Sequence, residues 1–410
     1  MIIRALGGPS LRLADQVLWS LAFFVANTAA LSELTVAAFA GLSVSTAVAF
    51  IVIAVVRAYS INAGVIVAVG VGVESTDSVS LRRGFGASVV GAIVTACTVG
   101  VWLTFSGDAN AWVLGALALL VVAADLPRQL LIIAGDYRRS LAVSMVYLGL
   151  VSGLLAGGHH HLGLPILFGW CASLVVVMTL GTSLAVKSLA SRQFQYPKTN
   201  EARRLAWALS LEAIYFGMAG QAGLLLLFAF EPDEATAGFR ISYALVYAPA
   251  FSILQGLMPL LVRWMSRQAV RGNFGAVRRA VTQWALATTA VIASCGLVSF
   301  VWLPWFTSDV PLSAVLPFLV PVGFSIAAAQ VLEVVVVARR LAGGTQGLHR
   351  QRTLLALLDI ALQSVGVLTL GVDGLVYALI ATSVIRAVLV AWYVGTLPRG
   401  FENHPDRGQG

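Results

Sequence analysis

The sequence predicts an all-α polytopic membrane bundle of about 12 transmembrane helices arranged in two six-helix halves. Hydrophobic residues make up 59% of the 410 positions and charged residues only 11%, far from the balance of a soluble globular protein. All but two of the 26 Lys and Arg residues lie in every second gap between the hydrophobic segments. Because cytoplasmic loops retain Lys and Arg and translocated loops lack them, this alternation predicts twelve spans with both termini in the cytoplasm.

The first half of the chain supplies six predicted spans. A bilayer core of about 30 Å needs roughly 20 apolar residues per helix, and segments of that length lie at 14–34, 37–57, 84–105, 110–132, 139–158 and 163–186. Arg4 and Arg12 precede the first span and Glu33 follows it, so the chain is expected to start in the cytoplasm. The apolar stretch 61–73 is too short to cross and is expected to lie at the interface.

The second half supplies the other six. The least hydrophobic stretch, 191–204, separates an N-terminal bundle (1–195) from a C-terminal bundle (205–397), with a linker at 196–204 and a cytoplasmic tail at 398–410. Spans are predicted at 206–229, 237–262, 281–303, 311–337, 353–371 and 374–396, the last two joined by a tight turn at Gly371. The longest inner connections, near 57–83, 187–205 and 263–281, leave no room for an extramembrane catalytic domain.

The two halves carry a weak internal repeat. Asp15 opens the first span and Gly41 follows 26 residues later, and Glu212 and Gly238 have the same spacing in the second half. Repeats packed about a site near the midplane are the usual construction of secondary transporters.

Three stretches resemble the polysaccharide-biosynthesis flippases of the multidrug/oligosaccharidyl-lipid/polysaccharide (MOP) exporter superfamily. They are 14–57, which begins with the Asp15-Gln16 pair and contains Phe39-Ala40-Gly41 where the family has Phe-Gly; 126–146, LPRQLLIIAGDYRRSLAVSMV; and 238–263, GFRISYALVYAPAFSILQGLMPLLVR. The resemblance implies alternating-access transport of polyprenyl-diphosphate-linked oligosaccharide across the bacterial cytoplasmic membrane. It also implies membrane lipids and, as protein partners, a polysaccharide polymerase or glycosyltransferases. The peptidoglycan-precursor flippases of this superfamily carry two extra helices, for which this sequence has no room beside the twelve predicted spans.

Arg386, inside the last predicted span, is the first candidate site residue. It lies about 11 residues, hence about 16 Å, from the cytoplasmic end. An Arg at that depth costs at least about 2.5 kcal/mol unless it is compensated. Asp359 and Gln363, one turn apart on the preceding span, are placed to reach it. The pattern leaves two interpretations open: a structural ion pair, or a cavity cation that binds a diphosphate.

The first span carries a polar stripe. Gln16, Ser20, Phe23 and Asn27 share one face, because offsets of 4, 7 and 11 residues return to nearly the same angle. Such stripes face the bundle interior, either as contacts between helices or as the lining of a cavity. Asp15, at the start of the span, is expected to cap the helix rather than to couple protons.

The remaining candidates are charged or polar residues near helix ends. With Arg386, the residues expected to contact substrate are Arg57, Arg240, Gln16, Asn27 and Gln255. Asp359 and Glu212 are the candidates for ion coupling, and Glu333 is expected to be an interfacial charge. The sequence contains no phosphate-binding P-loop and no nucleophile elbow, so an enzyme or an ATP-driven pump is disfavoured.

No cofactor, metal or nucleic-acid site is expected. The triplet His159–His161 cannot easily converge on one metal ion, and the net charge of +8 follows from the basic loops rather than from a nucleic-acid surface. Two alternatives to the flippase remain open. One is a cation-coupled multidrug (MATE-like) exporter, which needs a buried acid. The other is a non-transporting membrane partner of a glycan-assembly complex.

Overall fold

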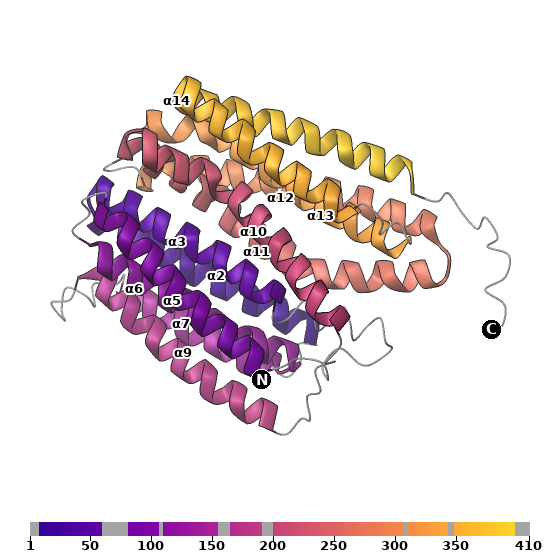
Figure 1. Ribbon diagram of the computed structural model, residues 1–410, viewed down its shortest axis with the longest axis horizontal. Helices are drawn as coiled ribbons and strands as arrows, with labels where there is room; N and C mark the ends of the chain where they lie inside the picture. The colour runs from indigo at the N-terminus through magenta and orange to yellow at the C-terminus, as the bar shows by residue number, and fades with distance from the viewer. Residues whose placement is uncertain are drawn as a thin grey trace.

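The computed structural model describes residues 8–59, 81–105, 110–154, 165–190, 200–306, 310–342 and 348–397, and its regular elements over these ranges are all helical. Figure 1 shows them as two groups of long helices lying side by side. The first group consists of α2 (Gly8–Glu33), α3 (Val36–Arg57), α5 (Leu81–Phe105), α6 (Ala111–Ile133), α7 (Tyr137–Gly153) and α9 (Ile166–Ala190). The second consists of α10 (Asn200–Phe230), α11 (Asp233–Val270), α12 (Phe274–Phe306), α13 (Leu312–Leu341) and α14 (Leu348–Gly395).

Helix α14 comprises the last two predicted spans. Gly371 has φ 60° and ψ −132°, a conformation that favours glycine, and it breaks α14 into an antiparallel hairpin. The backbones of Gly366 and Gly374 touch across this hairpin, where a Cβ would not fit. With α14 divided, the described helices match the twelve predicted spans, and the all-α fold class is confirmed.

Seven of the described helices are long and apolar enough to cross a membrane by length and composition, with α14 counted once. Their ends differ in charge. The ends nearest Arg57, Lys187 and the turn at Arg271–Asn273 form what we call the basic end, and those nearest Glu33, Glu231 and Asp373 form the acidic end. The basic end is the one predicted to be cytoplasmic.

Some predicted connections are wrong. No long loop joins residues 263 and 281, because α11 continues to Val270 and α12 begins at Phe274, with Gly272 (φ 70°) closing a tight turn. The predicted linker 196–204 is helical from Asn200, where good helix formers begin α10. The apolar stretch 61–73, the triplet His159–His161 and the tail 398–410 lie outside the described residues.

Matching hydrogen bonds occur in the two halves. Asp15 and Glu212, Gly41 and Gly238, and Ser45 and Ser242 are each 197 positions apart. Ser45 on α3 donates from Oγ to the Leu114 carbonyl of α6 at 2.7 Å, and Ser242 on α11 donates to the Val315 carbonyl of α13 at 2.9 Å. The repeat in the sequence therefore corresponds to the same contact between the second and fourth helices of each half.

The two groups of helices meet along two seams. In one, α3 packs antiparallel on α10: Tyr59 stacks edge-on against Trp207 at the basic end (centroids 5.7 Å apart), and Gly217 lies against Ile51 farther along. In the other, α2 contacts α11. The space between these seams contains the candidate site.

Candidate functional site

A cavity of about 320 Å³ lies between the two groups of helices. Helices α2, α3 and α6 line it on one side, and α10 and α11 line it on the other. Its volume is at the lower limit for sites that bind small molecules. Its polar lining consists of Gln16, Ser20, Asn27, Arg57, Asp125, Arg128, Gln221, Arg240 and Tyr243.

A completely buried ion pair forms the cavity wall toward the basic end. Arg128 Nη2 on α6 donates to Asp15 Oδ2 on α2 at 2.9 Å, and both side chains have zero exposure. Ser144 Oγ on α7 donates to the other oxygen of Asp15 at 2.6 Å. Arg128 also donates to Gln16 Oε1 at 2.8 Å. Asp15 lies two turns inside α2 and ties three helices together, so the prediction that it caps the helix is wrong.

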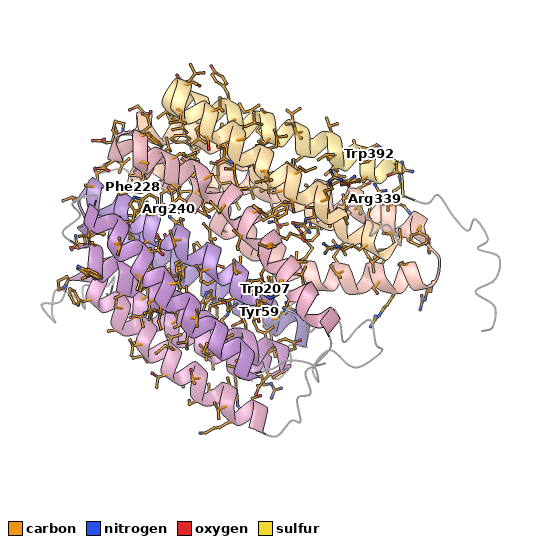
Figure 2. The ribbon with its side chains drawn as sticks, viewed as in Figure 1. Tyr59, Trp207, Phe228, Arg240, Arg339 and Trp392 are labelled. Atoms are coloured by element: carbon orange, nitrogen blue, oxygen red, sulfur yellow. The ribbon has the colours of Figure 1, made fainter. Side chains whose placement is uncertain are left out.

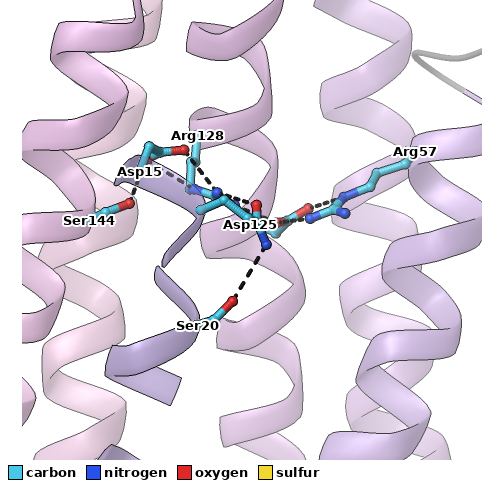
Figure 3. A network of polar contacts seen from close by, with 7 residues as sticks. Asp15, Ser20, Arg57, Asp125, Arg128 and Ser144 are labelled. Carbon is cyan, nitrogen blue, oxygen red and sulfur yellow. Dashed lines mark hydrogen bonds and ion pairs between the residues drawn. The ribbon is translucent and has the colours of Figure 1, made fainter. Parts of the chain in front are cut away.

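The ion-pair chain continues to a third helix. Arg57 at the end of α3 donates through Nε to Asp125 Oδ2 at 2.8 Å and forms a second, shorter contact through Nη2. Arg128 Nη1 lies 3.9 Å from Asp125, near enough for attraction but too far for a hydrogen bond. Figure 3 shows the chain from Asp15 to Arg57. Two arginines face two carboxylates, so this part of the wall carries no net charge.

Arg240 on α11 forms the opposite polar part of the cavity, toward the acidic end. Figure 2 shows it on the same side of the molecule as Phe228. Arg240 is only 4% exposed, and its one side-chain hydrogen bond to a described residue, from Nη2 to Asn27 Oδ1, is long at 3.4 Å. Its Nε is buried without a hydrogen-bond partner, and no carboxylate pairs with it in the described part of the chain. A guanidinium in this state favours an anion in the cavity beside it.

Aromatic rings cover the wall between these two polar parts. Trp19 stacks against the Arg128 guanidinium at 4.8 Å, and Phe23 contacts Phe50 with ring centroids 5.4 Å apart. Phe216 and Tyr243 face them from α10 and α11. The cavity is therefore amphipathic, with apolar rings in the middle and polar groups at both ends.

Arg386 lies in a smaller neighbouring cavity of about 160 Å³ among α10, α11, α13 and α14. It forms an ion pair with Asp359, and its Nη1 donates to Ser325 Oγ at 3.1 Å. Gln363 donates to Asp359 at 2.9 Å and to the Ala219 carbonyl at 3.0 Å. Of the two interpretations left open for Arg386, the structure contains the ion pair with Asp359, and the guanidinium is already neutralised.

A second ion-pair cluster connects α10, α13 and the start of α14. Glu212 accepts from Arg352 Nη1 at 2.8 Å, and Arg352 also pairs with Glu333. Arg340 lies 3.8 Å from Glu212. Glu333, expected as an interfacial charge, joins α13 to the start of α14 through Arg352. Asp15, Asp125, Glu212, Glu333 and Asp359 thus each lie against an arginine.

The structure brings together four of the predicted substrate contacts, since Gln16, Asn27, Arg57 and Arg240 line the central cavity. The polar stripe of the first span is thus cavity lining. Arg386 lies outside this cavity, and the side chain of Gln255 is among those the structure does not describe. In the described residues, no three His, Cys, Asp or Glu side chains are grouped to hold a metal ion.

Sequence reasoning missed four polar residues of the cavity, which are Asp125, Arg128, Gln221 and Tyr243. Neither Asp125 nor Arg128 is among the predicted site residues, although both lie within the predicted span 110–132. Gln221 was not singled out at all. The available signal was Asp125-x-x-Arg128 within one apolar helix, a spacing that puts both charges on one face.

Solved structures with the same fold are transporters. A mutant of the Vibrio cholerae MATE transporter VcmN has a TM-score of 0.63 at 14% identity, covering 95% of each chain. An inward-facing multidrug resistance MATE transporter of the MOP superfamily has a TM-score of 0.61 at 12% identity, covering 94% of this chain and 98% of that one. A MOP superfamily transporter from Pyrococcus furiosus, described as having a binding pocket of reverse polarity that suggests a different function, has a TM-score of 0.61 at 11% identity over 95% and 96%.

No protein-family model and no curated protein matches the sequence. At identities of 11 to 14%, the likeness to solved structures shows the fold alone. The chain has the fold of MOP-superfamily transporters, and its apolar helices indicate a multi-pass membrane protein.

Proposed function

We propose that this protein is a flippase that moves a polyprenyl-diphosphate-linked glycan across the bacterial cytoplasmic membrane by alternating access. The observation that carries the proposal is the state of Arg240. It is a buried cation that faces the central cavity, and no carboxylate neutralises it among the described residues. A diphosphate supplies the missing negative charge, and its oxygens match the donors of a guanidinium.

The rest of the cavity supports an amphipathic glycolipid cargo. Aromatic rings provide apolar surface, and Gln16, Asn27 and Gln221 provide amide groups that can bond to hydroxyls. The cavity lies between two groups of six helical segments, where secondary transporters of repeated construction place their substrate. Rocking of one group against the other would expose it to either side of the membrane.

The structure weighs against a cation-coupled drug exporter. Such a protein needs a buried acid that exchanges Na⁺ or H⁺ against a cationic drug. Asp359 and Glu212, the candidates for that role, are each held by an arginine, as are Asp15, Asp125 and Glu333. The Pyrococcus furiosus transporter described above is a precedent for a pocket of different polarity on this fold.

The test compares two arginine variants in liposomes that contain a polyprenyl-diphosphate oligosaccharide. Arg240→Gln removes the uncompensated cation. The control, Arg386→Gln with Asp359→Asn, removes a neutralised pair together. We expect wild type and control to invert the lipid, measured by access of a lectin, and Arg240→Gln to lose most of this activity while folding normally by circular dichroism.

Two results would contradict the proposal. Expulsion of a cationic dye under a Na⁺ or H⁺ gradient, without inversion of the glycolipid by wild type, would identify a drug exporter. Normal glycan assembly in cells by Arg240→Gln at matched expression would instead favour a non-transporting partner of a polymerase or glycosyltransferase.

A further inference from the structure

The side chain of Gln221 on α10 is buried but makes no hydrogen bond to any described residue. It is 8% exposed and lines the central cavity. The other buried glutamine with defined contacts, Gln363, bonds to Asp359 and to a backbone carbonyl, and the cavity residue Gln16 accepts from Arg128. No described side chain occupies the Gln221 amide, so its donors and its acceptor are available to a molecule in the cavity.

Gln221 lies at nearly the same depth as Arg240. At 1.5 Å per residue, Asn27 is about 9 Å from the acidic end of α2, Arg240 about 10 Å from that end of α11, and Gln221 about 13 Å from that end of α10. Gln16 is about 25 Å from the same end of α2. Gln221 therefore belongs to the Arg240 part of the cavity rather than to the ion-pair chain.

Comparison of residues 197 positions apart distinguishes those that maintain the fold from those that line the cavity. Positions related by 197 residues keep Gly41 and Gly238 alike, and Ser45 and Ser242 make the same contact in each half. The repeat partners of the polar cavity residues differ in kind: Phe24 stands opposite Gln221, Ser43 opposite Arg240, and Leu224 opposite Asn27. The repeat therefore does not require an amide or a cation at these three positions, and all three residues lie at the Arg240 end of the cavity.

We propose that Gln221 is a specificity-determining residue, which bonds a hydroxyl or acetamido group of the sugar next to the phosphate held by Arg240. An amide can donate to and accept from the same hydroxyl, whereas the guanidinium only donates and binds the oxyanion. This inference rests on the proposed function and adds the part of the cargo that is recognised. A cargo without a hydrogen-bonding group at that point would leave the amide unpaired and be carried poorly.

The test measures binding and transport separately. Calorimetry on the purified protein compares inorganic phosphate with a hexose 1-phosphate, in wild type, Gln221→Met, Arg240→Gln and Gln268→Met. Gln268→Met is the control, because it removes an amide whose contact is to Asn273 at the basic-end turn. Methionine keeps the volume of glutamine without its hydrogen bonds.

We expect wild type and Gln268→Met to bind the hexose 1-phosphate about tenfold more tightly than phosphate. Gln221→Met should lose this preference while binding phosphate normally, and Arg240→Gln should bind both weakly. An unchanged preference in Gln221→Met overturns the inference. If that preference is lost as expected but wild-type liposomes invert no polyprenyl-diphosphate lipid, the sugar subsite stands and the proposed transport function fails.

Discussion

Asp15 on α2 and Arg128 on α6 form an ion pair that is sealed from solvent on every side, with a distance of 2.9 Å between Asp15 Oδ2 and Arg128 Nη2. Ser144, Gln16 and the ring of Trp19 surround it. The second half repeats the arrangement loosely: Glu212, 197 positions after Asp15, lies 3.8 Å from Arg340 on α13. An acid on α2 thus faces an arginine on α6, and an acid on α10 faces an arginine on α13.

Breaking this pair on one side is expected to be severe. Asp15→Asn leaves Arg128 buried without its carboxylate, and removal of one member of such a pair costs about 3–5 kcal/mol. The double variant Asp15→Leu/Arg128→Met, which removes both charges, should be clearly more stable than either single change. Thermal unfolding in detergent measures this, and additive losses in the double variant would contradict it.

Arg57 should contribute less than Arg128, although both contact Asp125. Its side chain is 38% exposed, so water screens its charge and solvates the guanidinium once the pair is broken. We expect Arg57→Gln to lower stability by about 1 kcal/mol or less. A melting-temperature loss as large as that of Asp15→Asn would show that Arg57 is structurally essential.

The two matched serines provide a test of the repeat. Ser45→Ala and Ser242→Ala each remove a buried hydroxyl and leave a helix carbonyl with one hydrogen bond fewer. Each change should lower the free energy of unfolding by about 0.5–1.5 kcal/mol. Because the sites are far apart in the sequence and lie in different halves, their effects should add in the double variant. Chemical or thermal unfolding of the three variants checks both the sizes and the sum.

Arg240→Lys distinguishes charge from geometry. Lysine keeps the positive charge but lacks the planar set of donors that can hold two phosphate oxygens. Phosphate binding should fall less in Arg240→Lys than in Arg240→Gln. In both variants, added salt should weaken phosphate binding only to the extent that the site opens to solvent. Equal loss in the two variants would mean that the shape of the guanidinium, rather than its charge, is what the site requires.

The hairpin within α14 depends on two glycines. A Cβ at Gly366 or Gly374 would collide with the facing backbone, so either Gly→Val change should separate the two segments. The Asp359–Arg386 pair bridges the same two segments and should weaken with them. Loss of folded protein on size-exclusion chromatography is the expected result, and Gly395→Val, at an open position on the same helix, is the control.

The sequence determined the number and approximate bounds of the spans, because apolar length and loop charge follow directly from the cost of placing residues in a bilayer. It also determined the shared face of Gln16 and Asn27, since helical periodicity is local. It placed Asp359 within reach of Arg386, since a hairpin sets its own register, but left open whether the two pair, which the structure shows. The connections were less predictable. The Arg and Gly residues at 263–281 predict a loop. In the structure most of this segment belongs to α11 and α12, and only a tight turn separates the two helices.

Only the tertiary structure decided which charges are neutralised. Arg57, Arg128, Arg240 and Arg386 look alike in the sequence, but Asp125 reaches Arg57, Asp15 reaches Arg128, Asp359 reaches Arg386, and no described carboxylate reaches Arg240. Two of these contacts join residues more than 60 positions apart, and the packing of α2, α3 and α6 is what brings them together. Charge compensation in a low-dielectric interior depends on distances of a few ångströms between side chains on different helices. Hydropathy and residue spacing along one helix give no information about those distances.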